Sequence, residues 1–77
     1  MKHRVTVANV WWAEAQSLAE ARDLALAEAG ALALSLGWTV EARVTDPAGA
    51  FAGIALGRPT GIAEWLPLGS PRARAAA

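Results

Sequence analysis

The 77-residue chain carries seven basic and seven acidic side chains, so its formal net charge is zero, and it contains no cysteine. The lack of cysteine excludes disulfides and thiolate metal sites and fits a reducing cytoplasm. A net charge of zero argues against a protein whose affinity comes from neutralising many phosphates. Apolar residues make up 55% of the chain and charged residues 18%, which argues against disorder and favours a partner that covers apolar surface.

The length predicts one domain, which we place at residues 1–70 and follow with a disordered tail at 71–77. The most apolar run, residues 24–36, contains Glu28 and is too short to cross about 30 Å of hydrocarbon. The basic first residues are not followed by the apolar core of a secretory signal. We therefore expect a cytoplasmic protein that does not enter a membrane.

Residues 3–12 are rich in valine, threonine and tryptophan and predict a first β-strand, which could extend to Gln16. Because successive strand side chains alternate between faces, Trp11 and Trp12 must point to opposite sides. Strict alternation groups Trp12 with Thr6, whereas a bulge near Asn9 would turn Trp12 toward the core. Both arrangements stay open, and in either one we expect a protein partner to cover the second ring.

A capping box predicts where the helix begins. Ser17 stands three residues before Glu20, so the Ser17 hydroxyl can accept from the Glu20 amide while the Glu20 carboxylate accepts from the Ser17 amide. The helix should run from Leu18 to about Leu36 and end at Gly37. Steps of three and four residues define a stripe that we expect to face the sheet, namely Leu18, Ala21, Ala25, Ala29, Leu32 and Leu36.

Three leucines lie outside this stripe and make the helix apolar nearly all round: Leu24, Leu26 and Leu34. Either loops and the C-terminal segment cover them, or a second subunit does. Small residues at Ala27, Gly30 and Ala31 would let a second backbone approach. With the spare tryptophan, these leucines lead us to expect a homodimer that uses them as its interface.

The second half of the chain predicts an antiparallel meander. Residues 38–45 alternate between apolar and polar, with Trp38 among the core-facing side chains, and residues 50–56 return as a strand after the turn Asp46–Gly49. Gly53 suggests a bulge or a close contact, and residues 62–68 form either an edge strand or one helical turn. The order of elements predicts an α+β two-layer sandwich, with one long helix on a three- to four-stranded, mainly antiparallel sheet (β-α-β-β, or β-α-β-β-β).

Sites for catalysis or cofactors are not predicted. His3 is the only histidine and has no second ligand at metal spacing, so we expect no metal, no cofactor, no hydrolytic triad and no enzyme. The glycine-containing segment 53–61 lacks the lysine of a phosphate-binding loop. Bases stacked on the tryptophans would instead make the chain a small nucleic-acid-binding module, and an adaptor is a further alternative.

Acidic residues gather between positions 14 and 28, where Arg22 is the only basic residue: Glu14, Glu20, Asp23 and Glu28. Such a run is either a solvated helix face or a patch that meets a basic partner.

In size, alanine-rich composition, lack of motifs and single-helix organisation, the chain resembles the small anti-CRISPR proteins of phages and mobile elements. Such proteins occupy a surface of a CRISPR effector complex, often where target DNA enters. The resemblance implies a non-catalytic inhibitor that binds a Cascade-type complex and blocks its binding of target DNA. It also implies that Glu14, Glu20, Asp23 and Glu28 mimic DNA phosphates, and that Trp11 and Trp12 form an apolar anchor.

Overall fold

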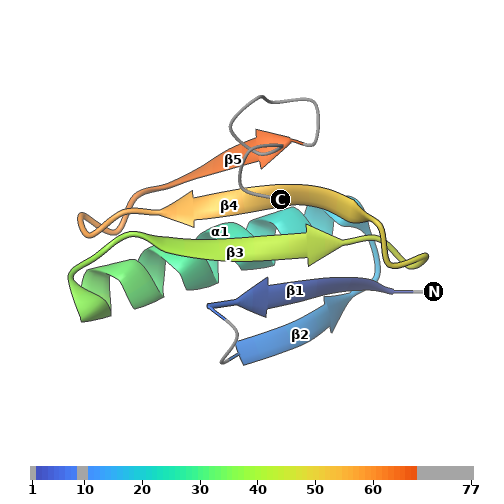
Figure 1. The fold of residues 1–77 in the computed structure, drawn as a ribbon, viewed down its shortest axis with the longest axis horizontal. Helices are drawn as coiled ribbons and strands as arrows, with labels where there is room; N and C mark the ends of the chain where they lie inside the picture. The colour runs from blue at the N-terminus through green and yellow to red at the C-terminus, as the bar shows by residue number, and fades with distance from the viewer. Residues whose placement is uncertain (1, 9–10, 68–77) are drawn as a thin grey trace.

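One helix packs on one face of a five-stranded antiparallel sheet, in the spatial order β2-β1-β3-β4-β5 (Figure 1). The computed structural model describes residues 2–8 and 11–67, except for the side chain of Trp11. The predicted α+β sandwich is confirmed, with more strands than expected; the expected boundary at residue 70 and the tail at 71–77 lie outside the described residues. The elements are β1 (His3–Val7), β2 (Trp11–Ala15), α1 (Leu18–Leu36), β3 (Val40–Thr45), β4 (Phe51–Gly57) and β5 (Ala63–Pro67).

The single first strand predicted over residues 3–12 is wrong, because this segment belongs to a hairpin. β1 pairs antiparallel with β2, which places Val7 opposite Trp11 and Thr6 opposite Trp12. Ala8 has a φ of 51°, a left-handed conformation that breaks a strand. Directly opposed residues of an antiparallel pair share a face, so Trp12 lies on the same face as Thr6.

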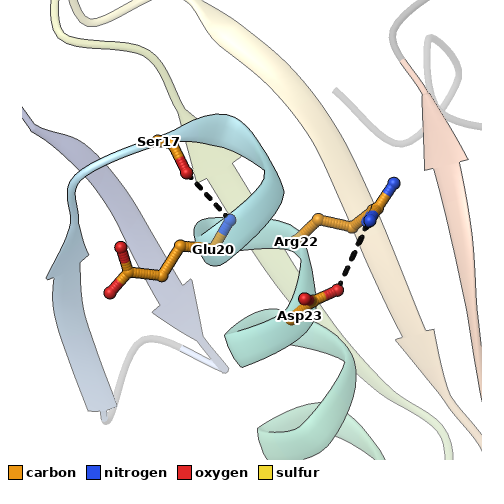
Figure 2. Close-up of polar contacts among 4 residues, drawn as sticks. All are labelled: Ser17, Glu20, Arg22 and Asp23. Atoms are coloured by element: carbon orange, nitrogen blue, oxygen red, sulfur yellow. Dashed lines mark hydrogen bonds and ion pairs between the residues drawn. The ribbon is translucent and has the colours of Figure 1, made fainter.

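The predicted helix and its N-cap are confirmed. The Ser17 hydroxyl accepts a hydrogen bond from the Glu20 amide at 3.2 Å (Figure 2). The Glu20 carboxylate accepts from the Gln16 amide at 3.1 Å, one residue earlier than the Ser17 amide that we predicted. At the other end, Gly37 has a φ of 81° and donates to the Ala33 carbonyl at 2.9 Å. These contacts satisfy backbone groups that a helix terminus otherwise leaves without partners.

The helix faces the sheet with its smallest residues. Its buried positions are Ala21, Ala25, Ala29, Gly30 and Ala33. Leu18 and Leu36 are exposed, so their predicted place in the core-facing stripe is wrong. Both lie at the ends of α1. Between these ends, a Cβ on Gly57 of β4 would overlap the backbone of Ala29. This close approach leaves no room for leucine between the layers, and leucines pack along the margin instead, at Leu24, Leu26 and Leu32.

The alternation predicted for residues 38–45 holds only from Val40 onward. Val40, Ala42 and Val44 are buried under the helix. Trp38 precedes β3 and is 59% exposed, so its predicted burial is wrong. The alternation of strand side chains does not extend to a residue outside the strand.

The two turns of the meander follow their sequence signals. In the predicted turn after β3, Asp46 Oδ1 accepts from the amides of Ala48 and Ala50 at 2.9 and 2.8 Å, and Gly49 has a φ of 88°. After the second turn, β5 forms an edge strand, one of the two predicted alternatives. The close contact predicted at Gly53 is confirmed, because the ring of Trp65 lies against it.

Within the described residues, no helix is both long enough and apolar enough to cross a membrane.

Candidate functional site

The sheet face opposite α1 is the candidate site, and we call it the open face. Strand alternation separates it from the helix-facing residues, since Val5, Val7, Ala42 and Val44 are buried in the helix-side core. The registers between the five strands then define its members. The open face comprises Arg4, Thr6, Trp12, Glu14, Glu41, Arg43, Thr45, Ile54, Leu56, Glu64 and Leu66.

A central row of directly opposed residues crosses this face from one edge of the sheet to the other. Each neighbouring pair is set by a strand register. In order from β2 to β5, the row is Trp12, Thr6, Arg43, Ile54 and Leu66. The row therefore changes from aromatic and polar side chains at β2 to aliphatic side chains at β5.

Trp12 ends the central row and is the most distinctive residue of the open face. Its side chain is 61% exposed. The guanidinium carbon of Arg4 lies 5.0 Å from the centroid of its ring, a cation–π arrangement. Glu14 stands directly opposite Arg4 across the β1–β2 pair, so a positive and a negative side chain border the same exposed indole.

A shallow hollow lies beside this stack, where β1 meets β3. It has a volume of about 410 Å³ and is lined by Thr6, Ala8, Glu41 and Arg43. The Ala8 amide donates to the Glu41 carbonyl at 3.2 Å, which holds the end of the β1–β2 hairpin against β3. The hollow is lined by hydroxyl, carboxylate and guanidinium groups, which suit a polar side chain of a partner better than an apolar ligand.

The aliphatic part of the open face has little accessible surface. Ile54 has no exposed surface, although its register opposite Arg43 puts it on the face away from α1. Leu56 and Leu66 are half-buried. The accessible part of the open face is therefore the β1–β2–β3 side, around Trp12.

The four acidic residues expected to form one patch do not lie together. Glu14 is on the open face, whereas Glu20, Asp23 and Glu28 are on α1, which covers the other face. Glu20 is occupied by the helix cap, and Asp23 forms an exposed ion pair with Arg22 at 3.5 Å. Figure 2 shows the Glu20 side chain extending away from the Arg22–Asp23 pair. Glu28 is half-buried.

The leucines expected at a dimer interface also separate. Leu24 and Leu26 pack partly against the core of their own chain, while Leu34 is exposed. The exposed leucine belongs to a set of large apolar side chains at the C-terminal end of α1 and the loops beside it: Leu34, Leu36, Trp38 and Ile62. Sequence periodicity missed this set, because it placed Leu36 and Trp38 in the core.

Gly30, which we expected to admit a second backbone, is buried within the chain. Its position lies against the β4–β5 turn, where an added Cβ would come within 2.7 Å of the Gly61 carbonyl oxygen. Ala27 and Ala31 are exposed on the outer side of α1. The expected set of small residues therefore divides between an internal contact and the surface.

Among the described residues, no group of three or more histidine, cysteine, aspartate or glutamate side chains is placed to hold a metal ion. The Nδ1 atom of His3 is buried and has no hydrogen-bond partner. The Ser17 hydroxyl is used by the helix cap.

Comparisons with protein-family models, with curated proteins and with solved structures found no match.

Proposed function

We propose that this chain is a non-catalytic binding protein that inhibits or adapts a larger assembly through its open face. The observation that carries the proposal is Trp12, whose large exposed indole lies under Arg4 at the end of the central row. Tryptophan and arginine are enriched among the residues that dominate the energetics of protein interfaces. A ring held in place by a stacked guanidinium also loses little side-chain freedom when a partner covers it.

Charge on the open face favours a protein partner over a nucleic acid. Arg4 and Arg43 are accompanied by Glu14, Glu41 and Glu64 on the same face. Single-stranded nucleic acids are bound by aromatic side chains within a positively charged groove, and carboxylates among the arginines oppose that arrangement. Such alternating charges instead give a protein interface its register and specificity.

A Cascade-type CRISPR effector complex is the partner we propose to test first. Support for this choice comes from the resemblance to small anti-CRISPR proteins in size, composition and single-helix organisation. In this proposal the chain occupies a surface of the complex by which target DNA enters, and it blocks DNA binding without turnover. Trp12 supplies the apolar anchor and Glu14 the acidic contact, because both lie on the open face.

The experiment titrates the chain against purified effector complexes and measures their binding of labelled target DNA. We expect the block to saturate near one chain per binding site. The decisive variant is Trp12→Ala, and Trp38→Ala is its matched control, because the two side chains are 61% and 59% exposed and only Trp12 lies on the open face. Loss of a central interface tryptophan typically costs about 2 kcal/mol or more, which is a factor of about 30 in affinity.

Two results would contradict this proposal. No association with any purified complex would remove the anti-CRISPR assignment for the complexes tested. Equal inhibition by Trp12→Ala and the unchanged chain would show that the open face around Trp12 is not the contact. Direct binding of labelled DNA or RNA, weakening steeply with salt, would favour the nucleic-acid alternative.

A further inference from the structure

The two edges of the sheet differ in how they are protected. β2 and β5 are the edge strands (Figure 1). β5 ends at Pro67, which has no amide to donate to another strand. β2, with the sequence WWAEA, has neither a proline nor a lysine, two devices by which edge strands avoid pairing with another chain. Within the described residues, β2 pairs only with β1, so one side of its backbone is available.

We propose that β2 pairs antiparallel with β2 of a second copy of this chain, which joins the two sheets into one. The association replaces the leucine-mediated dimer expected from the sequence. It shares Trp12 and Glu14 with the contact proposed above, but it requires only this chain and is therefore tested without an effector complex.

The residues of β2 favour one register. Antiparallel pairing of two identical strands is symmetric about one residue, and a centre at Ala13 is the one that pairs all five residues of β2. It places Ala13 opposite Ala13, Trp12 opposite Glu14 and Trp11 opposite Ala15. A centre at Glu14 would place two carboxylates directly opposite each other, which is destabilising.

The charges on the open face complement each other in this register. The second copy's Glu14 stands opposite Trp12, and Arg4 already lies over the Trp12 ring at 5.0 Å. The carboxylate therefore approaches the Arg4 guanidinium across the indole. Symmetry repeats the contact, so each copy contributes one arginine and one glutamate. The same pairing covers part of Trp12, whose side chain is 61% exposed.

Pairing about an axis perpendicular to the sheet keeps both open faces on one side and both helices on the other. The sheet order places α1 over the centre of the sheet and β2 at its rim (Figure 1). The dimer therefore presents two open faces as one continuous surface. A larger assembly that offered two matching sites would then bind with increased avidity.

The first test uses mixing of two charge variants. Arg4→Glu gives a chain with two acidic residues at the contact, and Glu14→Arg gives a chain with two basic residues. Each variant repels its own copy, so we expect its dimer to weaken by about tenfold or more in light scattering. Mixing the two should restore a dimer of twice 8.0 kDa, because each arginine then meets a glutamate across the interface. Repulsion within each chain is unchanged by mixing, so recovery reports the intermolecular contact alone.

The matched control is the exposed Arg22–Asp23 pair on α1. Arg22→Glu and Asp23→Arg each reverse one charge, as Arg4→Glu and Glu14→Arg do, but they lie away from β2. We expect both control variants to dimerise like the unchanged chain, alone and mixed. Circular dichroism of every variant checks that the fold is retained.

The second test uses the lack of cysteine in the chain. Ala13→Cys places one thiol at the symmetry centre, where opposed Cβ atoms stand about 4.5–5.5 Å apart, near the span of a disulfide at about 3.5–4.5 Å. We expect oxidation to yield a covalent dimer. Ala27→Cys, on the exposed side of α1, should stay monomeric under denaturing electrophoresis.

A monomer at all micromolar concentrations would overturn the proposal. So would a dimer that ignores both charge variants, or one that cross-links through position 27 and not through position 13. None of these readouts involves another protein. Their failure would leave the inhibitory function standing, and failure to bind an effector complex would leave the dimer standing.

Discussion

Gly57 lies directly against the backbone of Ala29, so close that a methyl group on Gly57 would overlap the Ala29 carbonyl. This contact sets the separation between α1 and the sheet. Backbone atoms on both sides of the contact mean that no side chain can rotate away to make space.

We predict that Gly57→Ala destabilises the fold by about 1–3 kcal/mol or more, the usual cost of adding volume to a packed core. Gly53→Ala is the comparison, because its closest contact is the far end of the Trp65 ring, which can shift. Chemical denaturation of the two variants measures the difference. A Gly57→Ala chain as stable as the unchanged one would show that the layers can separate freely.

The N-cap gives a second prediction. Ser17→Ala removes the acceptor of the Glu20 amide and should cost about 1 kcal/mol of unfolding free energy. Ser35→Ala, at an exposed site in the last turn of the same helix, is the control and should change stability by no more than about 0.5 kcal/mol. Equal effects of the two changes would mean that the hydroxyl at position 17 does not stabilise the helix start.

A third prediction compares the buried side chain of Ile54 with the exposed side chain of Trp38. Ile54 has no exposed surface, whereas Trp38 is 59% exposed. Ile54→Ala should therefore cost about 2–5 kcal/mol. Loss of a fully buried aromatic ring costs about 3–5 kcal/mol of unfolding free energy, and Trp38→Ala should cost much less. Urea denaturation orders the two; a larger loss for Trp38→Ala would contradict the observed core.

The separation of Glu14 from Asp23 gives a fourth prediction, which concerns the proposed inhibition. Glu14 lies on the open face and Asp23 on α1, on the other side of the sheet. We expect Glu14→Lys to weaken inhibition and Asp23→Lys to leave it unchanged, since a partner on the open face meets only the first. Added salt should weaken the Glu14 contribution as well, because exposed charges are screened over about 10 Å at 0.1 M. Light scattering of each variant at the assay concentration separates a lost contact from a lost dimer. Strong weakening by Asp23→Lys would move the contact to the helix.

Local backbone signals in the sequence predicted several elements correctly. Ser17, Gly37 and the Asp46–Gly49 turn lie where they were predicted, because caps and turns depend on residues a few positions apart. The β1–β2 hairpin was missed. Among the described residues of its turn, Ala8 has the positive φ. Alanine in a sequence does not indicate that conformation.

The core and the site depend on contacts between distant segments, which periodicity alone does not contain. Steps of three and four residues placed Leu18 and Leu36 at the helix–sheet interface, but both are exposed. The buried helix positions are small, and Gly57 of β4 lies against the backbone of one of them, Ala29. The position of Trp12 was left between two alternatives, and pairing with Thr6 decides it. Exposure of Trp38 could not be predicted without knowing that β3 begins at Val40.

The small residues between the layers also have a regular spacing in the sequence. Four alanines recur at every fourth position of α1, from Ala21 to Ala33. In β4, glycine, alanine and glycine occupy every second position, from Gly53 to Gly57. Surface positions and marginal leucines can be exchanged without disturbing this contact. A distant relative that shares this architecture should therefore be recognisable by its alanine and glycine spacing, even where its large hydrophobic residues and its charges have all been replaced.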